Sequence, residues 1–140
     1  MRKRALRFRT GLQIDVLAVI ALLTFFEQTK MTIAFADFEK VEMRTGKITR
    51  VEVFAKARKP AFKLWIDFGE FGIKQLSAQL TALYSPETLL GRQVIAVTNF
   101  PPKQIADFRS EVLVLGLPDE AGRVTLLAPD HVTPLGARVF

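Results

Sequence analysis

Short runs in which apolar and polar residues alternate, separated by Gly and Pro, fill the chain from residue 31 onward. Successive side chains of a β-strand point to opposite faces, so such runs predict strands with one buried and one solvent-facing side. Several short strands with frequent turn residues between them are typical of a sandwich or a barrel. The pattern therefore predicts an all-β fold.

The first three runs give the clearest strands. Residues 46–53 lose their alternation between Ile48 and Val51, as a β-bulge would produce, and barrels use bulges to curl. Residues 62–68 alternate strictly, and residues 73–80 follow after a turn that contains two glycines. We expect these last two runs to form a hairpin.

The later segments complete a barrel. Ser85 can cap a short helix that runs to residue 90 and ends at a glycine, and OB-fold barrels carry a helix after their third strand. Residues 92–100 and 110–117 read as two more strands, and residues 124–128 are expected to pair back as an extension. A five-stranded Greek-key OB-fold barrel with a short helix and a C-terminal strand extension is the simplest fold.

The first 30 residues have a different character, with a basic start and then an apolar stretch over residues 16–26. An export signal or anchor is one interpretation, but no small-x-small cleavage site follows Phe26. The stretch is shorter than the about 20 apolar residues that cross a bilayer. A packed helix is a second interpretation. We favour a third, a start assigned too far upstream, because Met31 opens a sequence that makes sense as a whole protein; residues 31–140 are then the domain.

The net charge of +6 suggests an anionic partner, but the charge is unevenly spread. Residues 1–30 carry six Lys or Arg and two acidic residues, or +4, which leaves only +2 for residues 31–140. An argument for nucleic acid must therefore rest on clusters of basic residues. The absence of cysteine removes disulfides and thiolate sites and leaves the chain indifferent to redox compartment, which fits a cytoplasmic location. Because the apolar stretch is too short to span a bilayer, we expect no membrane association.

The sequence offers no catalytic constellation: no nucleophile beside a base, no pair of tuned carboxylates and no metal-ligand set. The single histidine, His131, lies in a proline-flanked loop and is expected to be solvated. No Gly-rich loop followed by Lys-Ser or Lys-Thr is present to hold a nucleoside triphosphate. We expect a protein that is not an enzyme and has no metal or other cofactor.

Basic residues cluster instead between the first two strands of the barrel, at Lys56, Arg58, Lys59 and Lys63. In OB-folds this loop and the adjoining strand face form the usual oligonucleotide site. Trp65 shares the polar face with Lys63, and stacking a base on it would contribute about 1–3 kcal/mol. A solvated loop, and a cross-strand or dimer contact for Trp65, remain the alternatives.

A second cluster lies in residues 99–110, which we expect to be a loop joining the last two barrel strands, stiffened by two prolines. Its basic residues, Lys103 and Arg109, are expected at the same end of the barrel as the first cluster.

Five segments resemble the CsaA family: residues 37–48 (DFEKVEMRTGKI), 63–69 (KLWIDFG), 72–79 (GIKQLSAQ), 94–102 (VIAVTNFPP) and 110–116 (SEVLVLG). CsaA proteins are small bacterial and archaeal OB-fold proteins described as secretion-linked chaperones. They belong to the wider tRNA-binding domain family, which includes C-terminal appendages of some methionyl-tRNA synthetases and a subunit of phenylalanyl-tRNA synthetase. The first 30 residues lie outside the resemblance, which favours the misplaced start.

The resemblance implies a homodimer that binds tRNA through shape and backbone, and it implies no catalytic residue. The family's basic and polar surface corresponds to Arg58, Lys63, Ser77, Asn99, Lys103, Arg109 and Ser110. An apolar tail that includes Val132 and Phe140 leaves surface for a dimer to bury. We therefore expect an RNA-binding homodimer, with tRNA or another structured RNA as partner. The alternative is a chaperone that binds unfolded or preprotein polypeptides.

Overall fold

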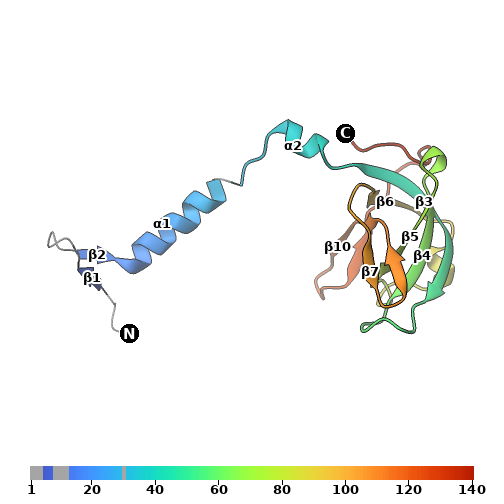
Figure 1. Ribbon diagram of the computed structural model, residues 1–140, viewed down its shortest axis with the longest axis horizontal. Helices are drawn as coiled ribbons and strands as arrows, with labels where there is room; N and C mark the ends of the chain where they lie inside the picture. The colour runs from blue at the N-terminus through green and yellow to red at the C-terminus, as the bar shows by residue number, and fades with distance from the viewer. Residues whose placement is uncertain (1–4, 8–12, 30) are drawn as a thin grey trace. The chain divides into compact units, whose positions relative to one another are not determined.

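A computed structural model describes residues 5–7, 13–29 and 31–140 of the chain. The chain divides into two compact units, Met1–Phe38 and Glu39–Phe140, both drawn in Figure 1.

The first unit contains a small hairpin and two helices. Strand β1 (Ala5–Arg7) pairs antiparallel with β2 (Gln13–Asp15), and helix α1 (Val16–Thr29) follows directly. The carboxylate of Asp15 accepts a 3.0 Å hydrogen bond from the amide of Leu17, which caps the start of α1. Helix α2 (Phe35–Glu39) leads to the second unit. Among the described residues, no helix is long and apolar enough to cross a membrane.

The second unit is built on a five-stranded antiparallel sheet in the order β5-β4-β3-β6-β9. Its strands are β3 (Met43–Val53), β4 (Phe62–Asp67), β5 (Ile73–Ala78), β6 (Gln93–Val97) and β9 (Leu113–Val114). The sheet curls into a nearly closed barrel, with Glu111 joining the free edge of β5: its amide donates to Gln75 O at 2.8 Å, and its carboxylate accepts from Gln75 N at 3.0 Å. The predicted OB-type barrel is confirmed.

A bulge in β3 produces the curl. The pairing of β3 with β4 shifts register between Ile48 and Arg50, which confirms the bulge expected from the lost alternation. A bulge bends and twists its strand, so the 11-residue β3 can pair with β4 along one part and with β6 along the other. Gly46 in β3 lies under the side chains of Ile66 and Phe68, which leave no room for a Cβ at this position.

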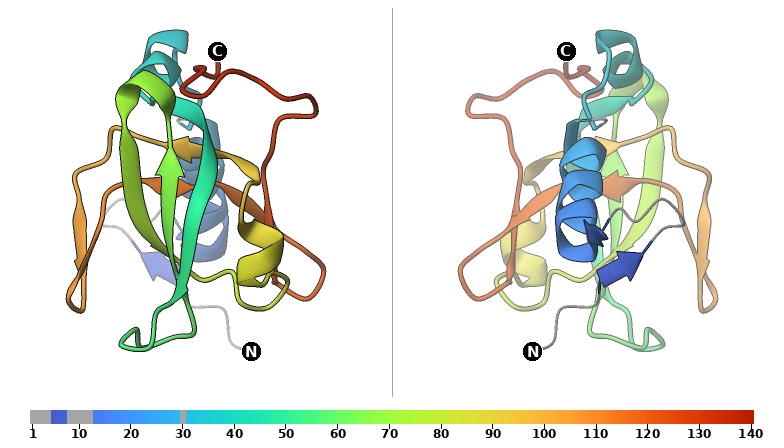
Figure 2. Two further views of the ribbon diagram at one scale, coloured as in Figure 1. Left: turned by 90° about the vertical axis from the view of Figure 1, so that its right-hand side faces the viewer. Right: turned by 90° about the vertical axis from the view of Figure 1, so that its left-hand side faces the viewer.

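The alternating pattern of β4 places the core as predicted. Leu64 and Ile66 are fully buried, and Lys63 and Trp65 on the other face are partly exposed. Helix α3 (Pro86–Leu89) contributes Leu89 to the same core and is fixed by a capping box between Ser85 and Thr88. Figure 2 shows α3 (yellow) and the hairpin described next (orange) on opposite sides of the barrel in the left view.

Residues 99–110 differ from the expected loop, because they contain a hairpin of β7 (Lys103–Ile105) and β8 (Phe108–Ser110). Its two-residue turn places Ala106 at a φ of 52°, in the left-handed region. Gly or Asn at this position would have indicated a hairpin turn in the sequence, whereas alanine does not. The predicted strand over residues 110–117 is likewise interrupted: β9 is followed by β10 (Gly116–Pro118), which pairs with β11 (Val124–Leu126).

The C-terminal tail runs back along the start of β3. The amide of Val139 donates to Met43 O at 2.9 Å, and that of Gly136 donates to Thr45 O at 2.8 Å. Val132, which precedes this paired segment, and Phe140, the last residue, are almost fully exposed, at 90% and 104%.

Candidate nucleic-acid interface

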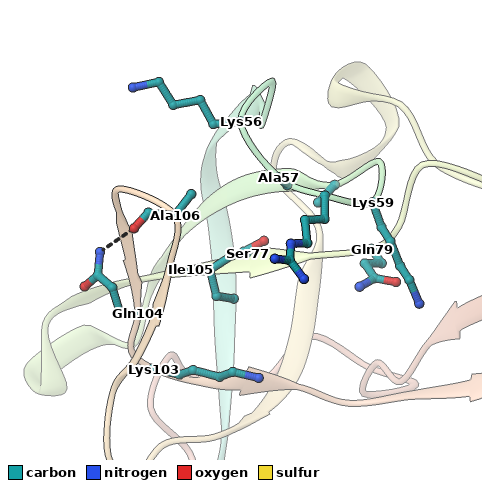
Figure 3. A pocket seen from close by; sticks show the side chains of 11 residues that line it. Lys56, Ala57, Lys59, Ser77, Gln79, Lys103, Gln104, Ile105 and Ala106 are labelled. Atoms are coloured by element: carbon teal, nitrogen blue, oxygen red, sulfur yellow. Dashed lines mark hydrogen bonds between the residues drawn. The ribbon is translucent and has the colours of Figure 1, made fainter.

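An open cavity of about 690 Å³ lies between the loop that joins β3 to β4, the end of β5 and the β7–β8 hairpin. The loop contributes Lys56, Arg58 and Lys59, and the hairpin contributes Lys103. Figure 3 shows Lys59, Ser77, Gln79 and Lys103 arranged around the opening, with Ile105 between Ser77 and Lys103. The structure therefore brings together the two basic clusters that the sequence separates by about half the domain.

The cations at this cavity differ in their partners. In the described part of the chain, Arg58, Lys59 and Lys103 make no ion pair. Lys56 is paired, with its Nζ 2.6 Å from the carboxylate of Asp107 in the hairpin turn, and Figure 3 shows its side chain pointing away from the opening. Three positive charges without a carboxylate partner thus face the same space, which favours an anion there.

The Lys56–Asp107 pair changes the protonation behaviour of both groups. The hydrogen bond to Asp107, helped by Coulomb attraction, raises the pKa of Lys56 above its ordinary value. The same hydrogen bond lowers the pKa of Asp107 below its ordinary value, against a smaller opposing effect of desolvation. Both pKa shifts favour the ionised forms, so the positive charge of Lys56 is balanced by the Asp107 carboxylate across the physiological pH range.

A cluster of aromatic rings anchors the loop and the hairpin to each other. Phe54 and Phe108 are buried, with ring centroids 5.6 Å apart in an edge-to-face arrangement. The ammonium of Lys63 lies 4.7 Å from the Phe54 ring centroid and 4.9 Å from that of Phe108. Lys63 is therefore held over these rings by cation–π attraction and does not line the cavity.

Trp65 belongs to this same support. Its ring meets Phe108 edge-on at 5.8 Å, and the guanidinium of Arg50 lies 4.3 Å from its centroid. Arg50 also pairs with Glu52. The indole is half-buried and already in contact with a cation, so it does not stand as an open platform for a base in this structure.

The remaining predicted residues lie outside the cavity. Asn99 ties the chain together at the start of β3, where its side chain accepts from Glu42 N and donates to Lys40 O. Arg109 is exposed, and its carbonyl accepts from the Gln75 side chain at 2.9 Å. The hydroxyl of Ser110 accepts from the amide of Ser77 at 3.3 Å.

Ser110 lines a second hollow, a groove of about 370 Å³ beside the first. Its walls include Phe100 and Leu113, which are 52% and 49% exposed. The two hollows share Ser77, Lys103 and Ile105, so a basic cavity and a more apolar groove adjoin along the hairpin.

Several residues of the cavity were not predicted from the sequence. Gln79 could have been found, because the alternation over residues 73–80 places it on the solvent-facing side together with Ser77. Gln104, Ile105 and Ala106 could not, since their position depends on the unrecognised hairpin.

No group of three or more His, Cys, Asp or Glu side chains that could hold a metal ion occurs among the described residues. The His131 ring lies 3.4 Å from the neighbouring Asp130 carboxylate, and both side chains are exposed.

The barrel, with basic residues on the β3–β4 loop and on the β7–β8 hairpin, has the features of an oligonucleotide-binding fold. The family model described as "Putative tRNA binding domain" matches residues 43–138. The methionine–tRNA ligase of Pyrococcus abyssi is 37% identical over 113 residues, which are 81% of this chain and 15% of the ligase. The chain thus spans only about 15% of the length of the curated relatives it matches.

Solved structures narrow the assignment. The chaperone CsaA from Bacillus anthracis is 51% identical with a TM-score of 0.74, over 78% of this chain and 99% of that one. The CsaA chaperone protein from Picrophilus torridus is 48% identical with a TM-score of 0.73, over 78% of this chain and all of that one. The chain belongs to the tRNA-binding domain family, and within it to the CsaA group.

Proposed function

We propose that this chain binds structured RNA, with tRNA as the leading partner, through the basic cavity between the β3–β4 loop and the β7–β8 hairpin. The observation that carries the proposal is the convergence of Arg58, Lys59 and Lys103, none of them paired with a carboxylate in the described part of the chain. The tRNA-binding domain family supplies the expectation that the anion is tRNA. Phosphates are the RNA groups that such cations hold.

The other basic residues take supporting parts in this proposal. Lys63, together with Trp65, holds the loop against the hairpin and adds positive potential beneath the cavity. Ser110 lines the adjoining groove and its neighbour Arg109 is exposed, so both extend the contact surface of a large ligand. Asn99, whose side chain is bonded to Glu42 and Lys40, keeps a structural part. In this proposal the chain acts as a cytoplasmic binding module with no catalytic part, and it aligns with only 15% of the length of the Pyrococcus abyssi ligase.

The test is a titration of tRNA at several salt concentrations. Arg58→Ala with Lys59→Ala should lower affinity and flatten the salt dependence, because each phosphate contact releases about 0.7–0.9 counterions. Lys47→Ala with Lys74→Ala removes the same charge from positions that do not line the cavity and should leave the slope nearly unchanged. Equal slopes for both double variants would contradict the proposal.

Polypeptide binding is the second candidate, and the adjoining groove favours it. Phe100 and Leu113 expose apolar surface beside a recess large enough for a side chain. Leu113→Ser should then weaken capture of an unfolded protein while tRNA affinity is retained. If the Arg58 and Lys59 variant binds tRNA normally but loses polypeptide binding, the chaperone function becomes the leading one.

A further inference from the structure

Resting on the proposed function, we infer that the basic cavity takes a single unpaired nucleotide of the RNA, with its base inside and its phosphates at the rim. RNA binding alone needs only the positive surface, whereas the cavity would enclose one base of the bound RNA.

The cavity has the size and the walls for a nucleobase. Its volume of about 690 Å³ falls within the range of sites that accept small ligands. Ala57, Ala61 and Ile105 give it apolar walls, and Figure 3 shows Ile105 between Ser77 and Lys103. The flat faces of a base can lie against such walls, whereas a phosphate gains nothing from them.

Two polar groups stand ready for the edge of a base. Within the described part of the chain, the hydroxyl of Ser77 and the amide of Gln79 make no hydrogen bond through their side chains. Both face the opening in Figure 3. A side-chain amide both donates and accepts, so it can match the mixed donors and acceptors on a base edge, whereas a phosphate would use only its donor.

The cations lie where the backbone of such a nucleotide would pass. Arg58 and Lys59 stand on the loop side and Lys103 on the hairpin side, so the phosphates before and after an inserted base would each meet positive charge. The bases of a duplex are stacked and paired, and only loops, bulges and ends offer a base that can leave the stack. The cavity therefore selects unpaired RNA.

The experiment uses the full chain and a synthetic RNA hairpin whose loop nucleotides are replaced one at a time by an abasic ribose, which keeps every phosphate. One replacement should lower affinity by about tenfold, the equivalent of about 1.4 kcal/mol, with the salt dependence unchanged. A blunt duplex with the same number of phosphates should bind more weakly than the parent hairpin.

Two variants connect the loss to the cavity. Gln79→Leu, at an exposed position, should bind the parent hairpin and its abasic form with nearly equal affinity, because the base edge has lost its partner. Ile105→Ala should narrow the same difference by removing a wall. Ile73→Ala, an exposed isoleucine that does not line the cavity, should keep the full difference.

The outcomes separate the two levels of the proposal. Equal affinity for the parent hairpin, every abasic form and the duplex, all with salt-dependent binding, overturns the inference and leaves RNA binding intact. A full abasic effect in Gln79→Leu also overturns it, because the base would then be read elsewhere. Binding of tRNA without binding of the hairpin counts against it as well. Absence of salt-dependent binding to any of these RNAs overturns the proposed function itself.

Discussion

Lys56 illustrates how one partner changes the part a residue can play. Its sequence neighbours Arg58 and Lys59 face the cavity without a carboxylate, but Lys56 is bound to Asp107 across the loop and the hairpin. Both side chains are well exposed, and exposed ion pairs contribute little to folding stability. The pair therefore bears on RNA binding more than on the fold.

We expect Lys56→Ala to change the salt slope of RNA binding less than Lys103→Ala does. The positive charge of Lys56 is already balanced by the Asp107 carboxylate. The raised pKa of Lys56 and the lowered pKa of Asp107 keep both groups ionised from the ordinary carboxyl range up to the ordinary lysine range. Asp107→Asn should make the slope steeper by releasing Lys56. Fluorescence titrations over a salt series measure both effects; a flatter slope in Asp107→Asn would contradict this assignment.

Among the elements, those predicted correctly are the ones whose signals are local. The alternation in β4 and β5 and the Ser85 cap of α3 are each visible within a few residues, and all three elements form where expected. For Trp65, a cross-strand contact was one of the alternatives, and Arg50 on the paired strand makes it. The contact with Phe108 was not predictable, because only the closed barrel brings that residue close. The sequence thus indicates the basic loop but not which of its residues reach the cavity.

The β7–β8 hairpin was not predicted because its turn has alanine, and not glycine or asparagine, at the left-handed position. A left-handed conformation destabilises a folded protein by roughly 1–2 kcal/mol when the residue is not glycine. Glycine removes this strain, but it also makes the unfolded chain more flexible, which cancels part of the gain in stability. We expect Ala106→Gly to raise the free energy of unfolding by up to about 1 kcal/mol. Urea denaturation measures it, with Ala57→Gly as a control that should destabilise; a less stable Ala106→Gly would argue against strain at this turn.

At the scale of the whole molecule, the buried core of the described residues begins only at Thr45. A chain of residues 31–140 should therefore unfold at the same urea concentration as the full chain and bind RNA with the same affinity at moderate salt. Mass spectrometry of the native protein should find Met31 at its N-terminus. Recovery of peptides from residues 1–30 would contradict the misplaced start, and a lower unfolding midpoint for the shorter chain would show that the first unit supports the second.

Dimerisation is the second prediction at this scale. Val132 and Phe140 expose their side chains almost completely, and Leu117 and Val124 of the β10–β11 hairpin are also exposed. Apolar surface of this extent is usually covered by a partner in stable proteins. Sedimentation equilibrium should give about twice the 15.7 kDa chain mass. A species of single-chain mass at tens of micromolar would contradict the prediction.

The edge of β5 is closed by side chains, since Gln75 N is bound by the Glu111 carboxylate and Ser77 N by the Ser110 hydroxyl. Side-chain acceptors can swing aside without unfolding a strand, whereas ladder bonds open together. In deuterated water, the amides of Gln75 and Ser77 should exchange faster than that of Leu76, which points toward β4. This seam borders the basic cavity, so bound RNA should slow the exchange of Ser77 in particular, giving a readout of occupancy at a single amide.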